Sequence, residues 1–387
     1  MYTLLLAVIY LAFISLGLPD SLLGAGWPGM HEALQVPVSH MGIVTMVISG
    51  CTVVSSLASD ALTRRWKTHV VTTVSVFLSA LSLFGFSHAT QFWMLIACAI
   101  PYGLSAGSID AALNNYVALH YSSRHMSWLH CFWGVGTIVS PFVMSRALSG
   151  GVWQNGYTTI ALLQAGIGVA LLAALPLWRV NKPRTAANGE AKSVGLVGAL
   201  KIGGVPCLLL GFFGYCAAEA TVMGWASTYL TEVRGMTAER AAAFGSLFFI
   251  GLTAGRFLAG FLTDRLGDRR MIRLGTAVSL AGMACILIPA ASEMLALAGF
   301  VVIGLGFAPI YPCIIHATPD NFGAEHSGAI IGIQMASAYA GSTFMPPVYG
   351  VIGKAVGFGV MPVYLIAFTA LMIVMVERTF GMTKKEA

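Results

Sequence analysis

The sequence predicts an all-α membrane protein in which twelve transmembrane helices form two pseudo-symmetric six-helix halves. The prediction depends on composition, on the number of long apolar segments and on where the basic residues fall. Of the 387 residues, 57% are hydrophobic and only 9% are charged, whereas soluble domains carry about 25% charged residues. Such a chain is expected to lie within a lipid bilayer, and it is not expected to be an enzyme.

Transmembrane helices are expected wherever the chain offers about 20 mainly apolar residues, enough to cross the hydrocarbon core. The segments that qualify are 3–30, 38–60, 69–87, 91–120, 127–149, 155–178, 201–230, 238–263, 271–290, 293–317, 325–353 and 357–378. The connection between the sixth and seventh segments is longer, polar and rich in proline and glycine, which is typical of a linker. We therefore predict an N-terminal six-helix bundle at 1–178, a cytoplasmic linker at 179–200 and a C-terminal six-helix bundle at 201–387.

The basic residues support this topology, because the cytoplasmic loops of membrane proteins are rich in lysine and arginine. With both termini in the cytoplasm, most of the 21 basic residues fall on the cytoplasmic side, so the net charge of +6 does not indicate nucleic-acid binding. The seven cysteines are scattered through apolar segments without metal-ligand spacing, and no metal or cofactor is expected. The pattern is compatible with a monomer in a bacterial inner membrane.

Three acidic residues lie inside long apolar segments, at Asp20, Asp110 and Glu219. An ionised acid at the bilayer centre costs about 2.5–3.5 kcal/mol even on a lenient scale, so such residues usually mark a path for a proton, an ion or a substrate. All three are candidate proton-coupling residues. The alternatives are structural: a kinked helix at Asp20, hydrogen bonding between helices at Asp110, and a salt bridge across the domain interface at Glu219.

The two halves repeat one pattern in their first helices. Asp20 is followed by a glycine and Trp27, and Glu219 is followed by a glycine and Trp225. Parallel repeats related by an axis along the membrane normal are a known transporter architecture. The two tryptophans are candidates for stacking on a solute, although aromatic residues in membrane helices more often pack or anchor the helix at the interface.

Asp110 and Asn114 lie four residues apart in the fourth segment, which places both side chains on one face of a helix. The carboxylate accepts hydrogen bonds and the carboxamide both donates and accepts them, a combination that suits a polyhydroxylated ligand. His130 in the fifth segment is a further polar candidate, and its alternative role is helix packing.

The segment Gly260–Arg270 resembles the signature loop of the major facilitator superfamily, with a glycine, the pair Asp264 and Arg265, a second glycine and a basic pair. The resemblance implies a charge-paired gate on the cytoplasmic side, in which Arg256 of the eighth helix also takes part. The alternative is a plain cytoplasmic turn with solvated charges.

The first half carries a degraded counterpart of this loop after its second helix. Of the signature, mainly Asp60 and Arg64 remain there, without the glycines. We assign these two residues to the same predicted gate.

Further motifs resemble the fucose permease branch of the superfamily, which contains proton- or sodium-coupled sugar symporters. These motifs are Asp-x-x-x-Asn at 110–114, Leu-His-x-x-x-Gly-x-Gly at 129–136, Gly-Tyr-x-x-x-Glu at 214–219 and Ala-Pro-Ile-Tyr-Pro at 308–312. The superfamily lines its central cavity with helices that here carry the acids and His130. By the same placement, Trp133, Tyr311 and Gln334 are expected to contact substrate.

We therefore predict a secondary active transporter that takes up a small polar solute, most simply a monosaccharide, together with H⁺ or Na⁺ by alternating access. Two alternatives remain. A drug or metabolite exporter of the same fold predicts a cavity rich in methionine and phenylalanine. A non-transporting membrane receptor predicts no solute exchange, and the linker is short for a folded signalling domain.

Overall fold

The structure is a computed structural model that describes residues 2–180, 194–237, 240–241, 247–288 and 293–383. Every regular element in these ranges is a helix. The chain divides into two compact units, which we call unit 1 and unit 2. Unit 1 contains residues 1–116 and 129–186, and unit 2 contains residues 117–128 and 187–387. Of the predicted linker, residues 181–193 lie outside the described residues.

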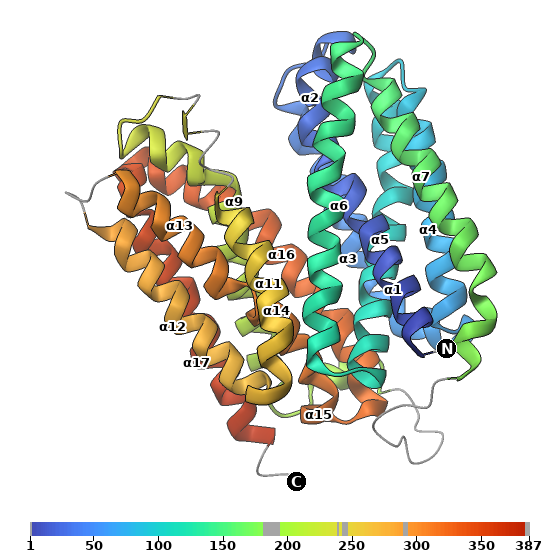
Figure 1. Cartoon of the computed structure of the whole chain (residues 1–387), viewed down its shortest axis with the longest axis vertical. Helices are drawn as coiled ribbons and strands as arrows, with labels where there is room; N and C mark the ends of the chain where they lie inside the picture. Colours follow the sequence, from blue (N-terminus) through green and yellow to red (C-terminus); the bar gives the residue numbers. More distant parts are fainter. Residues whose placement is uncertain (1, 181–193, 238–239, 242–246, 289–292, 384–387) are drawn as a thin grey trace. The chain divides into compact units, whose positions relative to one another are not determined.

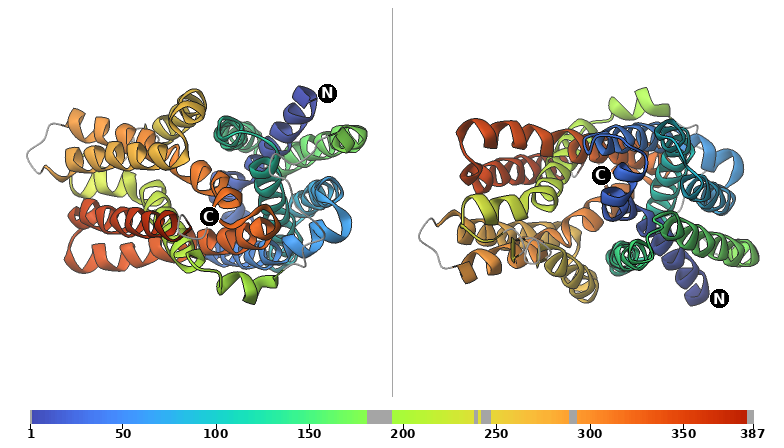
Figure 2. Two further views of the ribbon diagram at one scale, coloured as in Figure 1. Left: turned by 90° about the horizontal axis from the view of Figure 1, so that it is seen from below. Right: turned by 90° about the horizontal axis from the view of Figure 1, so that it is seen from above.

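Unit 1 consists of seven α-helices and a short 3-10 helix, counted over the described residues (Figure 1). They are α1 (Tyr2–Asp20), α2 (Leu22–Ala33), α3 (His40–Trp66), α4 (Thr68–Ser87), α5 (Phe92–His120), α6 (Ser123–Ser149), α7 (Gln154–Ala173) and η1 (Leu175–Val180). The turn between α5 and α6 belongs to unit 2. Helix α7 packs along α4 and also contacts α1, and Figure 2 shows the helices of the unit from its two ends.

The first predicted transmembrane segment is broken into α1 and α2 at Ser21, directly after Pro19 and Asp20 at the end of α1. A proline inside a helix removes one backbone hydrogen bond and kinks the chain. The kink places the Asp20 carboxylate at the end of α1, where the backbone is no longer continuous. Ser21 stabilises the break by donating a hydrogen bond to the carbonyl of Thr137 on α6, at 2.7 Å.

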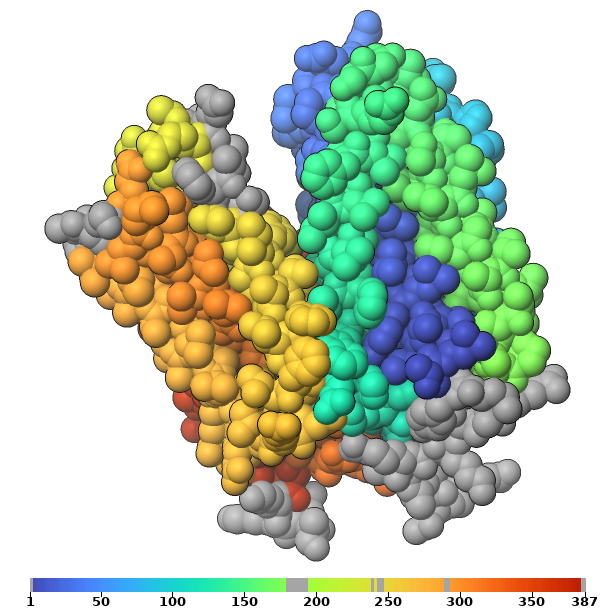
Figure 3. All heavy atoms as spheres, in the orientation of Figure 1, coloured from blue at the N-terminus to red at the C-terminus, as the bar shows by residue number. Residues whose placement is uncertain are grey.

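Helices α1 and α6 approach each other closely because glycine removes side chains from their interface. A β-carbon at Gly136 would lie 2.4 Å from the carbonyl oxygen of Ile14, and one at Gly17 would lie 2.1 Å from the carbonyl oxygen of Trp133. Only glycine fits such a contact without moving a backbone. Figure 3 shows α1 at the surface between α6 and α7. The close approach brings residues of α6 beside Asp20.

Unit 2 is also helical throughout its described residues. Its helices are α8 (Gly195–Leu200), α9 (Val205–Glu232), α11 (Leu247–Leu266), α12 (Asp268–Leu287), α13 (Glu293–Phe307), α14 (Ile310–His316), α15 (Thr318–Phe322), α16 (Ala324–Val356), η2 (Phe358–Val360) and α17 (Met361–Thr383). Helix α9 packs between α16 and α17, while α13 packs against α11 and α12. The predicted tenth transmembrane segment is interrupted at Ala308 and Pro309, between α13 and α14.

Eleven segments of the described chain are long and apolar enough to cross a membrane. The long helix α16, with 33 residues, provides the remaining span of the predicted set. The protein is therefore an integral, multi-pass membrane protein, as predicted.

The signature segment forms a very short connection between two helices. Residues 260–266 form the end of α11, residues 268–270 begin α12, and Gly267 alone joins the two helices, with φ +78°. The counterpart in unit 1 is equally tight, because Lys67 alone joins α3 and α4, with φ +64°. One residue of positive φ is enough to reverse the chain between two helices.

Candidate functional site

Asp20 is the most accessible of the three predicted acids. Its carboxylate is exposed on the surface of unit 1, where it accepts hydrogen bonds from the Trp133 indole at 2.8 Å and from the Tyr102 hydroxyl at 3.1 Å. The three residues come from α1, α6 and α5. The arrangement presents a fixed carboxylate beside an indole ring, with further acceptor positions on the carboxylate still available.

Asp110 belongs to a buried chain of polar groups inside unit 1. Asn114 donates a hydrogen bond from Nδ2 to Asp110 Oδ1 at 2.7 Å, and Asn114 Oδ1 lies 3.1 Å from His130 Nε2. An amide oxygen only accepts hydrogen bonds, so His130 donates its Nε2 proton in this contact. Each of the three residues is at most 5% exposed. The predicted pair on one helix face is therefore present, and His130 is joined to it.

The two clusters of unit 1 are held by the same two helices, α5 and α6. Tyr102 lies about two turns before Asp110 on α5, and Asp110 and Asn114 are one turn apart. His130 and Trp133 are three residues apart on α6 and therefore share a face of that helix. On α6, the partner of Asp20 and the partner of Asn114 thus lie within one turn of each other.

Glu219 forms a salt bridge within unit 2. Its Oε1 lies 3.3 Å from Arg256 Nη2 and 2.9 Å from the hydroxyl of Tyr215. The Tyr215 hydroxyl also lies 3.0 Å from the carbonyl oxygen of Phe307. Arg256 is nearly fully buried, so its charge depends on this carboxylate. Both partners of the salt bridge belong to unit 2, whereas the structural alternative from the sequence was a bridge across the domain interface.

Aromatic residues surround the Glu219 salt bridge. Tyr311 packs against Phe212 and Tyr215, with ring centroids 4.7 and 6.0 Å apart, and its hydroxyl contacts the sulfur of Met335 at 3.4 Å. Gln334, next to Met335, is fully buried and accepts a hydrogen bond from Thr318 at 3.1 Å. Tyr311 therefore contacts α16 at the residue next to Gln334, so these two predicted substrate residues lie in the same part of unit 2.

The two predicted stacking tryptophans contact other groups of the protein, and their role in binding solute stays a prediction. Trp27 is only 3% exposed, lies in the hydrophobic core of unit 1 and donates a hydrogen bond to the carbonyl of Val38 at 2.8 Å. Trp225 donates to the carbonyl of Pro346 at 2.9 Å and stacks on Phe358, with centroids 5.6 Å apart. Among the contacts of the described residues, Trp27 is not joined to Asp20 and Trp225 is not joined to Glu219. Both rings pack against other side chains of their own unit.

The charges of the predicted gate are distributed over three places. Asp60 and Arg64 pair with each other at 3.0 Å, one turn apart on α3. Asp264 pairs with Arg124 at 3.1 Å, and Arg265 is exposed.

Arg256 pairs with Glu219 of α9. It lies about two turns before Asp264 on α11, and its part in the gate stays a prediction. An arginine in an apolar helix needs a nearby carboxylate, and α9 provides one.

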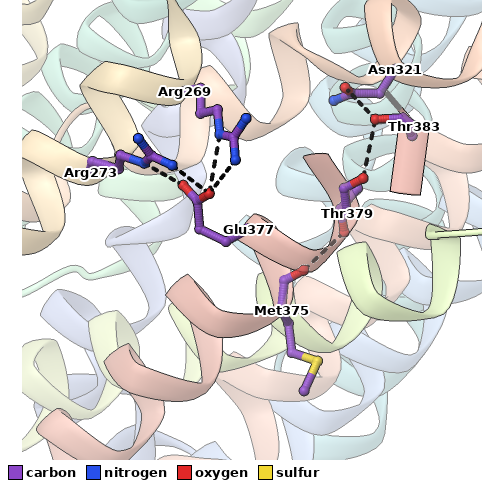
Figure 4. Close-up of polar contacts among 7 residues, drawn as sticks. All are labelled: Arg269, Arg273, Asn321, Met375, Glu377, Thr379 and Thr383. Carbon is purple, nitrogen blue, oxygen red and sulfur yellow. Dashed lines mark hydrogen bonds and ion pairs between the residues drawn. The ribbon is translucent and has the colours of Figure 1, made fainter. Parts of the chain in front are cut away.

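Arg269 of the signature segment and Arg273, one turn further along α12, bind the last helix of the chain. Glu377 of α17 accepts hydrogen bonds from Arg269 and Arg273 of α12, with N–O distances of 2.6 to 3.1 Å (Figure 4). One turn or more further along α17, Thr383 donates to Asn321 of α15 at 3.1 Å. These contacts fix the ends of α12, α15 and α17 to one another.

Several site residues were not predicted from the sequence as site residues. Tyr215 had a local signal, since it lies four residues before Glu219 on the same helix face. Tyr102 and Arg124 had none, because their partners are 82 and 140 positions away in the chain. Only the packing of the helices brings such residues together.

Comparison with known proteins identifies the family. A sequence model described as "Major Facilitator Superfamily" matches residues 9–329 and 208–387. The chain belongs to the major facilitator superfamily. The resemblance stated from the signature segment is therefore confirmed, and so is the twelve-helix fold in two six-helix halves, because solved structures of this family superimpose on the whole chain.

An uncharacterised MFS-type transporter of Yersinia pestis is 25% identical over 370 residues, which cover 93% of each chain. A probable nitrate/nitrite antiporter of Thermus thermophilus is 22% identical over 326 residues, or 76% of this chain and 72% of that one. The crystal structure of FucP, the Escherichia coli fucose:proton symporter, in its outward conformation has a TM-score of 0.82 and 16% identity, covering 97% of this chain and 98% of FucP. This last likeness establishes the fold alone.

Proposed function

We propose that this member of the superfamily is a proton-coupled symporter that takes up a small polar solute, most simply a monosaccharide, by alternating access. The observation that carries the proposal is the exposed Asp20 carboxylate, which Trp133 and Tyr102 hold beside an indole ring. A carboxylate accepts hydrogen bonds from sugar hydroxyls, and an indole packs on the apolar face of a pyranose ring. The similar fold of a fucose:proton symporter supports this solute class.

The buried chain of Asp110, Asn114 and His130 is the proposed proton-coupling element. A buried carboxylate is costly when it is charged and lacks a cation, whereas the protonated acid is neutral. Asn114 donates an amide hydrogen bond to Asp110, and this acceptor contact is compatible with both the charged and the protonated acid. Sodium is the alternative coupling ion.

Glu219, Tyr311 and Gln334 of unit 2 are further proposed solute-binding residues. Tyr311 lies beside Tyr215, which bonds to Glu219. The charges at Asp60, Arg64, Asp264 and Arg265 serve as the proposed cytoplasmic gate.

Both termini are proposed to face the cytoplasm of a bacterial cell, because most basic residues then lie on that side. We propose that the protein functions as a monomer in the inner membrane, with lipid and solute as its partners.

The alternatives make different demands on the same residues. A nitrate-type anion would need a buried cation that the protein does not already neutralise, and Arg256 is paired with Glu219. An exporter of apolar compounds would use the aromatic and methionine cluster around Tyr311, without need of the Asp20 carboxylate. A receptor would bind a solute without exchanging it.

The first experiment identifies the solute and the ion. Purified protein is screened by thermal shift against monosaccharides, nitrate and apolar drugs, at two pH values and with or without Na⁺. The expected result is stabilisation by one or a few monosaccharides, followed by uptake into proteoliposomes that a pH gradient drives. Stabilisation by nitrate or apolar drugs alone would reject the sugar assignment, and uptake that needs Na⁺ but no pH gradient would replace the proton.

The coupling role is tested with Asp110→Asn, which keeps the acceptor oxygen for Asn114 but removes the ionisable acid. Accumulation driven by the pH gradient should fall to the level without a gradient, while solute counterflow persists. Glu32→Gln is the matched control, since Glu32 is exposed near the end of α2. Full gradient-driven accumulation by the Asp110→Asn protein would exclude Asp110 from coupling.

A further inference from the structure

The turn between α5 and α6 is bound to unit 2 by an acidic pair. We call residues 117–128 the docking segment, because they belong to unit 2 although α5 and α6 are otherwise part of unit 1. Asp264 Oδ1 accepts the backbone N–H of Arg124 at 3.1 Å, while Asp264 Oδ2 contacts the Ser122 hydroxyl at 3.2 Å and Arg124 Nε at 3.1 Å. A carboxylate at the first turn of α6 also suits the positive end of the helix dipole.

A second group of contacts holds the docking segment through a histidine. His316, the last residue of α14, lies with Nδ1 2.6 Å from Asp268 Oδ2 and with Nε2 3.1 Å from the backbone carbonyl oxygen of Tyr121. Ser123 donates a hydrogen bond to the other oxygen of Asp268. The side chains of His316 and Asp268 are 4% and 13% exposed. The imidazole ring thus joins an acid of unit 2 to the docking segment.

The hydrogen-bond partners of the His316 imidazole determine which of its two nitrogens need a proton. A backbone carbonyl only accepts hydrogen bonds, so Nε2 carries a proton that it donates to Tyr121. Nδ1 then faces Asp268 at 2.6 Å, and that contact needs a proton between the two atoms. Whether this proton belongs to the ring or to the acid, the pair holds it jointly. Without it, a ring lone pair faces a carboxylate oxygen, and the contact becomes repulsive.

The charged and titratable neighbours of this pair are few in the described residues. On α6, Arg124 pairs with Asp264 of α11, and the ring of His125 packs on Tyr121 and Trp128. On α14, the thiol of Cys313 lies 3.9 Å from the Ser123 hydroxyl. Asp320, on α15, follows His316 by four residues and is exposed. Asp268 is the acid that contacts the ring, and Arg124 and Asp264 pair with each other.

We propose that His316 and Asp268 form a proton-binding site whose occupancy holds the docking segment on unit 2. The inference rests on the proposed function in one respect, because loss of this proton would free α5 and α6 to move during a transport cycle. Linkage fixes the direction of the effect: the docked arrangement binds one proton, so acid strengthens docking and a rise in pH weakens it.

The test is hydrogen–deuterium exchange of the full-length protein in lipid nanodiscs, without solute or gradient. Exchange is compared at about pH 6 and about pH 9, values on either side of ordinary histidine titration, after correction for the intrinsic pH dependence of amide exchange. Peptides covering the docking segment should exchange about tenfold faster at the higher pH, which corresponds to about 1.4 kcal/mol of lost docking energy. In His316→Gln they should exchange fast at both pH values.

Two histidine controls separate this site from its surroundings. His125→Gln removes the other histidine of the docking segment, and His326→Gln removes one that contacts Glu325 on α16; both proteins should keep the pH dependence. If His316→Gln does not fold, Asp268→Asn must abolish the pH dependence in its place. Equal protection of the wild-type segment at both pH values, or a His316→Gln protein that keeps the difference, would overturn the proposal.

The result is independent of the proposed symport. Docking that depends on pH in a protein without proton-driven uptake would uphold the proton site and reject the coupling. Docking that does not depend on pH in an active proton symporter would reject only the site.

Discussion

At the scale of single residues, the three acids in the membrane differ in what holds them. Asp20 is bound by an indole and a phenol, Asp110 by an amide, and Glu219 by a guanidinium. The pairing of Asp110 with Asn114 was predictable, because residues four apart on a helix are neighbours. The partners of Asp20 were not, since they are 82 and 113 positions away. Spacing along the chain therefore predicted the pair of Asp110 and Asn114, but it did not predict that Asp20 would be bound by residues of α5 and α6.

The salt bridge between Glu219 and Arg256 predicts a large effect on stability. Glu219→Gln would leave a buried guanidinium without its counter-charge, since the Arg256 side chain is only 5% exposed. Removing one partner of a buried pair typically costs about 3–5 kcal/mol. We expect a clear drop in the unfolding midpoint of the detergent-solubilised protein, measured by the fluorescence of a thiol-reactive dye during heating.

An exposed pair in the same unit provides the control. Arg240 and Glu293 lie 3.0 Å apart with side chains 55% and 44% exposed, so Glu293→Gln should cost no more than about 1 kcal/mol. The double substitution Glu219→Leu with Arg256→Met removes both buried charges and should recover much of the lost stability. If Glu219→Gln costs no more than Glu293→Gln, the buried bridge does not stabilise unit 2.

At the scale of the helix, composition predicted which segments are helical but not how they end. The breaks near Pro19 and Pro309 carried a sequence signal, because proline cannot continue the backbone hydrogen bonding. The reversals at Lys67 and Gly267 did not, since each is made by a single residue of positive φ. Trp27 illustrates the same limit for side chains, because its position in the core depends on which face of α2 packs inward.

The contact between α1 and α6 leads to a prediction about glycine. Gly136→Ala places a methyl group 2.4 Å from the carbonyl oxygen of Ile14, and overpacking of this kind typically costs about 1–3 kcal/mol. Gly50→Ala is the matched control, because a β-carbon there meets no atom within 4 Å, and alanine is the better helix former. Unfolding midpoints should fall for Gly136→Ala and hold or rise for Gly50→Ala; equal midpoints would show that the two helices adjust without cost.

At the scale of the whole molecule, the sequence predicted two halves, and the structure contains two compact units whose boundary, between residues 186 and 187, falls within the predicted linker. The polar clusters of the site are each complete within one unit: Asp110 with His130 in unit 1, and Glu219 with Arg256 in unit 2. The assignment of residues 117–128 to unit 2 could not be predicted, because it depends on tertiary contacts with Asp264 and His316 rather than on composition.

This division predicts that the chain can be cut in the linker without loss of either fold. Fragments 1–186 and 187–387, co-expressed, should co-purify and restore solute counterflow, because each keeps its own buried hydrogen bonds and ion pairs, and the docking segment can bind Asp264 and Asp268 across the cut. Fragment 187–387 alone should be helical by circular dichroism but inactive.

Arg124→Ala in the first fragment should reduce co-purification, because it removes the ion pair to Asp264, whereas Arg146→Ala near the end of α6, outside the docking segment, should not. Fragments that fold separately but never associate would show that the docking segment is not enough to bind fragment 1–186 to fragment 187–387.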